Sequence, residues 1–110
     1  MRQLTRRSFL ISAIATPVAL VALPAFAQHR THEVTIDGMT FSPQELHISP
    51  GDSVLFVNND RAPHLVRMDD GGQTDRLNQG QSDSMTFPSP GTRSYECAIH
   101  PSMSGRIFID

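Results

Sequence analysis

The clearest signal in this chain is SYECAIHPSMSGRIFI, residues 94–109, in which two strand-like runs enclose one short loop. In the second run, residues 106–109, an isoleucine recurs at every second position. Because successive side chains of a strand point to opposite faces, Ile107 and Ile109 are predicted to face one side and Phe108 the other. This alternation is typical of a strand in a β-sheet.

The loop between the two runs carries Cys97, His100 and Met103 at intervals of three residues. Thiolate and thioether sulfurs favour Cu(I), and imidazole accepts both oxidation states of copper. Pro101 limits the backbone freedom of this loop. Cys97 is the only cysteine, so an internal disulfide is excluded. We therefore predict that its thiol binds a metal ion.

The first 27 residues have the organisation of a secretory signal peptide. They begin with three arginines, continue with an apolar stretch from Phe9 to Leu23 and end on the small-residue sequence AFA. Cleavage is predicted between Ala27 and Gln28, which would retain no membrane span. Residues 5–10, TRRSFL, resemble a twin-arginine export signal, and general secretion is the alternative. The bacterial character of the signal predicts a periplasmic location.

Residues 28–110 are enough for one small domain, which we expect to be a monomer. Three of the nine arginines lie in the leader, so six arginines remain against eleven acidic residues. The exported chain then has a net charge of about −5, which argues against nucleic acid as a partner because nucleic acid needs a basic surface.

The spacing of turn-forming residues in residues 28–110 predicts an all-β fold. Short runs rich in Val, Ile, Phe and Thr are separated by clusters of Gly, Pro, Asn and Asp, and no useful length of chain shows helix periodicity. Residues 50–52 and 89–91 contain Pro-Gly pairs typical of turns, and the polar residues 69–81 are predicted to be a surface excursion. Two packed sheets of seven to eight strands are expected. The candidate strands are Glu33–Ile36, Glu45–Ile48, Ser53–Asn58, His64–Met68, Ser84–Phe87, Ser94–Cys97 and Arg106–Ile109.

A metal on the loop also needs a donor from elsewhere in the fold, and His64 is the best candidate. It is predicted at the start of a strand, and Pro63 stiffens its approach. The set of His64, Cys97 and His100, with Met103 as a weak axial donor, matches the His2Cys arrangement of electron-transfer copper sites.

Four stretches of the chain resemble the cupredoxins, the type 1 (blue) copper proteins, and among them the amicyanin and plastocyanin type. They are MTFSPQELH (39–47), PGDSV (50–54), Pro63-His64, and the segment from Tyr95 through His100 to Gly105. The resemblance implies an eight-stranded Greek-key β-sandwich with one copper ion, whose ligands would be His64, Cys97, His100 and Met103. One departure is Leu65, which stands where family members commonly have an asparagine that supports the cysteine loop.

The function implied by the resemblance is electron transport by single electrons between redox partner proteins. The partner is open between a c-type cytochrome, a periplasmic dehydrogenase and a respiratory oxidase. His100 is expected to lie nearest to solvent and to conduct the electron. The apolar ring expected around it, which suits brief docking, comprises Ala62, Pro63, Ile99, Pro101 and Met39.

The alternatives to electron transfer are a copper carrier and an enzyme. A periplasmic copper carrier or buffer would use the same soft ligands, and His29 and His32 favour it because they could bind a second metal ion. An enzyme is not expected: a Cys-His nucleophilic pair needs a substrate cleft with an oxyanion site, and a copper oxidase needs an open coordination position, which Met103 would close.

Overall fold

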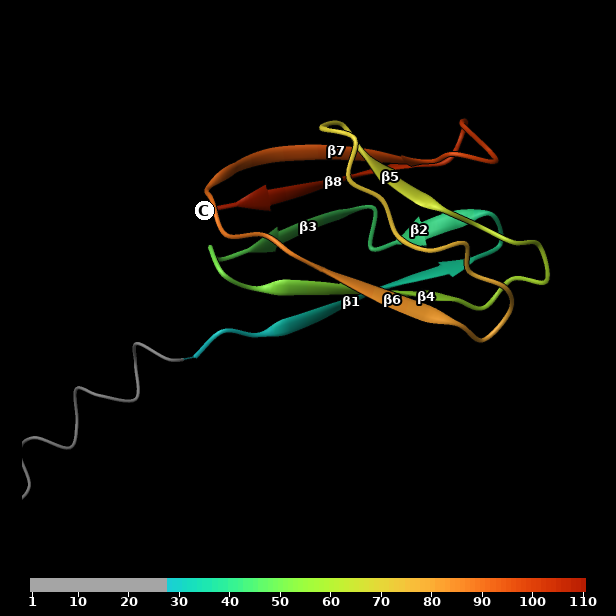
Figure 1. Cartoon of the computed structure of the whole chain (residues 1–110), viewed down its shortest axis with the longest axis horizontal. Coiled ribbons are helices and arrows are strands. Elements are labelled where there is room, and N and C mark those ends of the chain that lie inside the picture. The colour runs from blue at the N-terminus through green and yellow to red at the C-terminus, as the bar shows by residue number, and fades with distance from the viewer. Residues whose placement is uncertain (1–27) are drawn as a thin grey trace, which may run out of the picture.

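The computed structural model describes residues 28–110, which form two four-stranded sheets packed face to face (Figure 1). The expected signal peptide, residues 1–27, lies outside the described residues. One sheet has the strand order β2-β1-β4-β6 and the other β3-β8-β7-β5. The strands are β1 (Thr31–Asp37), β2 (Thr40–Ser42), β3 (Glu45–Ile48), β4 (Ser53–Asn58), β5 (Val66–Met68), β6 (Ser82–Thr86), β7 (Gly91–Cys97) and β8 (Ser104–Ile109).

The predicted all-β sandwich is confirmed, and residues 28–110 contain no helix. Within this part of the chain there is accordingly no apolar helix of membrane-spanning length. Consecutive strands repeatedly change sheets, so that β1 runs parallel to β4 and β3 parallel to β8. Only β1–β2 and β7–β8 are neighbours both in sequence and in a sheet. These crossovers bring loops from distant parts of the sequence to the same end of the sandwich.

The hydrophobic core lies between the sheets and contains side chains from both. Phe56 of β4 has no exposed surface, and its ring packs edge-on against Tyr95 of β7 with centroids 5.4 Å apart. The ring of Phe41 contacts Tyr95 in the same way at 4.8 Å. Complete burial of one phenylalanine side chain contributes about 1.5–3 kcal/mol, so this aromatic group is a main source of attraction between the sheets.

The alternation in β8 is as predicted. Ile107 and Ile109 are buried in the core. Phe108 points to the outer face, where its ring stacks on His47 of the paired strand β3 with centroids 4.7 Å apart.

The structure corrects the prediction for three segments. β2 was not predicted, because it is only three residues long and a single buried side chain, Phe41, marks it. The strand predicted to begin at His64 begins at Val66, and His64 instead makes an isolated bridge to Leu77. Leu77 is buried, and so is Thr74, so residues 69–81 are more than a surface excursion.

At the end of the sandwich where β1 and β4 begin, the carboxylate of Asp52 connects the turn before β4 to the start of β1. One oxygen accepts the backbone N–H of Arg30 at 2.9 Å, and the other accepts the N–H of Ser49 at 3.0 Å and the His32 ring at 2.9 Å. These bonds, led by the one from Arg30 and followed by the one from His32, lower the pKa of Asp52 to about 2. His32, a candidate for a second metal site, is thus engaged with a carboxylate.

The lowered pKa of Asp52 predicts a pH-dependent contribution to stability. The ionised carboxylate stabilises the fold above its ordinary pKa of about 4, and this contribution disappears as the pH falls from about 4 to about 2. We expect Asp52→Asn to melt several degrees below the parent at neutral pH, with a gap that closes in acid. Thermal unfolding followed by circular dichroism between pH 7 and pH 2 checks this, with the exposed Asp110→Asn as control. A gap that stays constant into acid would contradict the assignment.

Candidate metal centre

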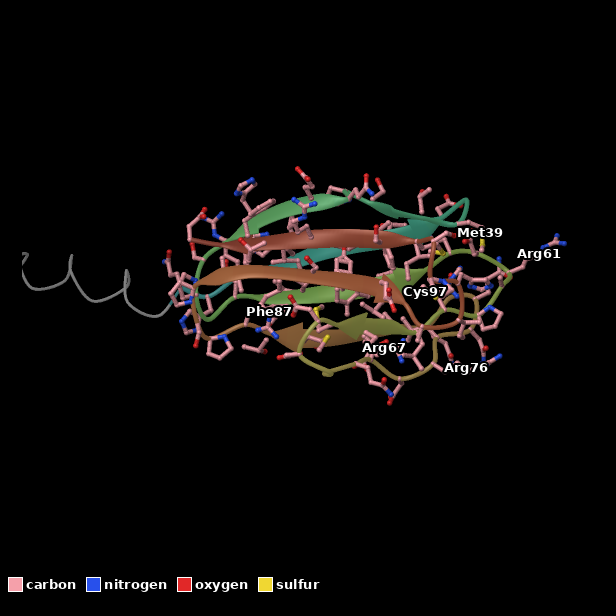
Figure 2. All side chains as sticks on the ribbon, turned by 90° about the horizontal axis from the view of Figure 1, so that it is seen from above. Met39, Arg61, Arg67, Arg76, Phe87 and Cys97 are labelled. Atoms are coloured by element: carbon pink, nitrogen blue, oxygen red, sulfur yellow. The ribbon has the colours of Figure 1, made fainter. Side chains whose placement is uncertain are left out.

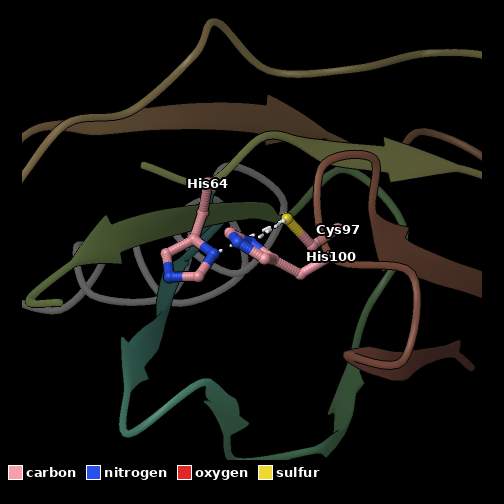
Figure 3. Close-up of side chains that lie close together, drawn as sticks. All are labelled: His64, Cys97 and His100. Atoms are coloured by element: carbon pink, nitrogen blue, oxygen red, sulfur yellow. Dashed lines mark hydrogen bonds between the residues drawn. The ribbon is translucent and has the colours of Figure 1, made fainter. Parts of the chain in front are cut away.

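Three of the predicted ligands converge at one end of the sandwich (Figure 3). The Cys97 sulfur lies 3.5 Å from Nδ1 of His64 and 3.7 Å from Nδ1 of His100. Cys97 and His64 have no exposed surface, whereas His100 is half-buried. The two imidazole rings meet at 60° with centroids 5.0 Å apart.

These separations fit a transition-metal ion. Metal–sulfur and metal–imidazole bonds are about 2.3 Å and about 2.0–2.1 Å long. At angles between tetrahedral and trigonal, such bonds place the sulfur and nitrogen about 3.6–3.8 Å apart. The structure shows nearly this spacing for both histidines of the group. A thiolate with two imidazoles is the donor set of a trigonal copper site, and the residues present are therefore positioned to bind copper.

Backbone hydrogen bonds hold the loop that carries two of these side chains. Cys97 is the last residue of β7, and its N–H donates to the carbonyl of Met103 at 3.0 Å. The N–H of Met103 donates in turn to the carbonyl of His100, also at 3.0 Å. The loop is therefore a closed turn between two paired strands, and the geometry of its ligands is set locally.

Met103, the predicted axial ligand, lies on the same loop and is 4% exposed. Its side chain belongs to the buried cluster between the sheets, and its backbone closes the turn described above. Coordination by its thioether sulfur stays a prediction.

A second loop, between β4 and β5, supplies His64. The backbone N–H and carbonyl of His64 both bond to Leu77, at 3.0 and 2.7 Å. Asn58 is fully buried at the end of β4, and its side-chain amide donates to the carbonyls of Ala62 and Leu77 at 2.9 Å each. These contacts hold the loop from both sides, and none of them was predicted, because Leu77 and Asn58 carry no local signal of a metal site.

The cysteine loop is supported at position 65 even though the residue there is a leucine. Its backbone carbonyl accepts the N–H of Ala98, the residue after the cysteine, at 2.8 Å. The two ligand loops are therefore joined by a main-chain bond, which does not depend on the side chain at position 65.

The ring of His64 is anchored on its far side by a carboxylate. Nε2 of His64 lies 3.0 Å from Oδ2 of Asp60, whose side chain is 13% exposed. Burial opposes ionisation of this carboxyl, but bonds from the Met39 amide, from His64 and from the Gly38 amide together lower the pKa of Asp60. Asp60 was not predicted as a functional residue, although a carboxylate four residues before a candidate ligand histidine is a local signal in the sequence.

Comparison with known proteins agrees with this geometry. The family model for a cupredoxin-like domain matches residues 9–109. Amicyanin-alpha from Methylorubrum extorquens is 32% identical over 84 residues, which are 71% of each chain. A solved structure of a reduced amicyanin variant matches with a TM-score of 0.69 at 29% identity, over 73% of this chain and 82% of that one.

One further match is to a larger protein. A copper-containing nitrite reductase from Thermus scotoductus has a TM-score of 0.70 at 30% identity, over 79% of this chain but only 26% of the enzyme. The likeness thus concerns about one quarter of that protein. The expected family is confirmed by all of these matches: the chain belongs to the cupredoxin family.

Proposed function

We propose that this protein is a blue copper protein that carries single electrons between redox partners, with one copper ion held by His64, Cys97, His100 and Met103. The observation that carries the proposal is the convergence of the Cys97 sulfur with two imidazole Nδ1 atoms at 3.5 and 3.7 Å. Bound copper would supply a reversible one-electron couple between Cu(I) and Cu(II).

The chain itself would provide rigidity and exclusion of water. Cys97 and His64 are completely buried, and main-chain bonds hold both of their loops. Ligands that cannot rearrange impose one geometry on both oxidation states, which keeps the reorganisation on electron transfer small. His100 is the partly exposed member of the group and is therefore the route by which an electron would enter or leave.

The apolar surface around His100 supports docking of a redox protein at this end. Among residues 28–110, the exposed large hydrophobic residues are Met39, at 41%, and Ile99, at 38%. Ile99 precedes His100 in the loop, and Met39 lies at the same end of the sandwich as Cys97 (Figure 2). A small apolar patch allows close approach without tight binding, as transient electron-transfer complexes require.

A charge placed in this patch is expected to slow the reaction with a partner. We expect Ile99→Asp to lower the second-order rate constant with a c-type cytochrome about tenfold, because docking would desolvate the new carboxylate. The visible spectrum of the copper form should stay unchanged. Stopped-flow measurement checks this, with Thr92→Asp, at an exposed position on β7, as the charge-matched control. Equal rates for the two variants would place docking elsewhere.

The proposed function is tested by adding one equivalent of Cu(II) to the exported protein and recording its visible and EPR spectra. An intense blue colour with narrow copper hyperfine splitting supports the proposal. Fast electron self-exchange with slow copper release then favours an electron carrier, whereas rapid release to a chelator favours a copper carrier or buffer. Burial of Cys97 and His64 supports retention of the ion.

We also propose that the carrier is exported to the periplasm after removal of residues 1–27 and acts without catalysing a reaction of its own. The leader pattern supports export. The match to amicyanin-alpha over 71% of each chain supports electron carriage. Mass analysis of the protein from a periplasmic extract tests the cleavage after Ala27.

A further inference from the structure

The carboxylate of Asp60 joins the loop between β4 and β5 to the turn between β1 and β2 at the proposed copper end. Its Oδ2 accepts the Nε2–H of His64 at 3.0 Å and the backbone N–H of Met39 at 2.9 Å. Its Oδ1 accepts the backbone N–H of Gly38 at 2.8 Å. Both oxygens are thus occupied, and the backbone N–H of Asp60 is itself held by the side chain of Asn58 at 2.8 Å. The carboxylate is therefore held in one place.

From this geometry we infer that Asp60 is a positioning residue: it sets the tautomer and orientation of His64 toward copper and connects that ligand to the exposed Gly38-Met39 turn. The inference rests on the proposed function, because it concerns a ligand of the proposed site. It goes beyond that function in assigning a role to a residue that contacts no metal.

The contact with Asp60 determines which nitrogen of the neutral His64 ring carries the proton. An ionised carboxylate can only accept a hydrogen bond, so its contact with Nε2 requires the proton of neutral His64 to be on Nε2. Nδ1 then carries a lone pair, and this atom faces the Cys97 sulfur at 3.5 Å. Because the His64 ring has no exposed surface, water cannot replace Asp60 in this role without a rearrangement.

The negative charge of Asp60 affects how strongly His64 donates electrons to copper. A negative carboxylate on the far side of a ligand imidazole makes that ring a stronger electron donor, as in other carboxylate–histidine–metal arrangements. A stronger donor stabilises Cu(II) more than Cu(I). The native carboxylate is therefore expected to lower the reduction potential, and its neutralisation is expected to raise it.

The turn between β1 and β2 is held by the same carboxylate. Gly38 and Met39 both have positive φ values, of 62° and 61°, and this conformation directs their two successive N–H groups at one carboxylate. Met39 is exposed in the apolar patch proposed for docking. The same side chain thus holds a copper ligand and part of the docking surface, so the two are mechanically joined through Asp60.

The test compares Asp60→Asn with Asp37→Asn in the copper form. Both variants remove one negative charge, but Asp37 is exposed at the end of β1 and does not contact His64. We expect Asp60→Asn to lower Cu(II) affinity about 10- to 100-fold and to raise the reduction potential, with a changed EPR hyperfine splitting. Asp37→Asn should change these quantities little. Equal effects in the two variants would overturn the inference.

A second measurement needs no variant that might fail to fold. In ¹⁵N NMR spectra of the metal-free and Cu(I) forms of the parent, His64 should carry its proton on Nε2, and this proton should exchange slowly with solvent. A proton on Nδ1 of metal-free His64 would overturn the inference. A parent that never forms the blue site would instead overturn the proposed function, so the two failures are distinguishable.

Discussion

Replacement of Cys97 by serine is expected to abolish the blue colour completely. The intense absorption of a type 1 site requires a thiolate bonded to copper, and a serine hydroxyl does not supply this ligand at neutral pH. His64 and His100 would remain, and their Nδ1 atoms would still be able to hold Cu(II) in a weaker, pale complex with wide hyperfine splitting. Visible and EPR spectra recorded after addition of one equivalent of Cu(II) check the expectation.

The design of this experiment excludes two trivial outcomes. Circular dichroism of Cys97→Ser should match that of the parent, because serine is nearly the size of the cysteine that it replaces in this buried position. A His29→Ala, His32→Ala double variant should keep the blue colour, since His32 bonds to Asp52. The parent and Cys97→Ser could instead give the same pale complex, and the double variant could lose it. Copper would then be bound near the N-terminus, and the result would favour a copper carrier or buffer over an electron carrier.

The second large effect is expected at Gly105, in the strand that follows the ligand loop. Gly105 pairs with Tyr95 of β7, and the tyrosine ring lies over the glycine. A Cβ atom at position 105 would come within 2.4 Å of Cζ and within 2.4 Å of the hydroxyl oxygen of Tyr95. Because this ring is packed between Phe41 and Phe56, it has little room to move. We expect Gly105→Ala to destabilise the protein by about 1–3 kcal/mol.

Urea unfolding of the metal-free protein measures this cost, with Ser104→Ala at the exposed neighbouring position as the control. A double-mutant cycle with Tyr95→Leu isolates the clash, because the cost of Gly105→Ala should fall to well under half when the ring is absent. A cost that stayed the same in the Tyr95→Leu background would show that the ring is not its cause.

The hydroxyl group of Tyr95, the ring that covers Gly105, does not add to the stability of this packing. It is buried, burial raises its pKa, and it has no hydrogen-bond partner in the described part of the chain. An unsatisfied buried hydroxyl is unfavourable. The close cover of the ring over Gly105 therefore depends on the packing of its carbon atoms, as the Gly105→Ala experiment assumes.

Much of the metal centre could be read from the sequence because it is local. Cys97 and His100 are three residues apart in one short loop, so a turn closed by main-chain hydrogen bonds is enough to bring their side chains together. The strand pattern is equally local, since alternation in β8 follows from the two-residue period of an extended chain. For the same reason β3 and β4 have the predicted bounds, Glu45–Ile48 and Ser53–Asn58.

His64 is an intermediate case. The sequence and its family resemblance predicted His64 as a ligand. Local structure, however, does not bring it to 3.5 Å from the Cys97 sulfur, 33 positions away. Its meeting with Cys97 depends on the pairing of β5 with β7, in which Val66 lies opposite Cys97. Such a register is a property of the assembled sheets.

The kind of chemistry, the class of fold and the ligand loop could be predicted from the sequence, because each depends on residue types at short spacing. Only the tertiary structure showed that Asp60 holds His64, that Leu77 anchors its backbone and that Met39 shares the Asp60 carboxylate. These contacts join residues of three separate segments, and they form only when the crossovers between the two sheets place those segments at one end. The physical reason is that strand order and register depend on the burial of both sheets against each other. They therefore cannot be predicted from any short segment of the sequence.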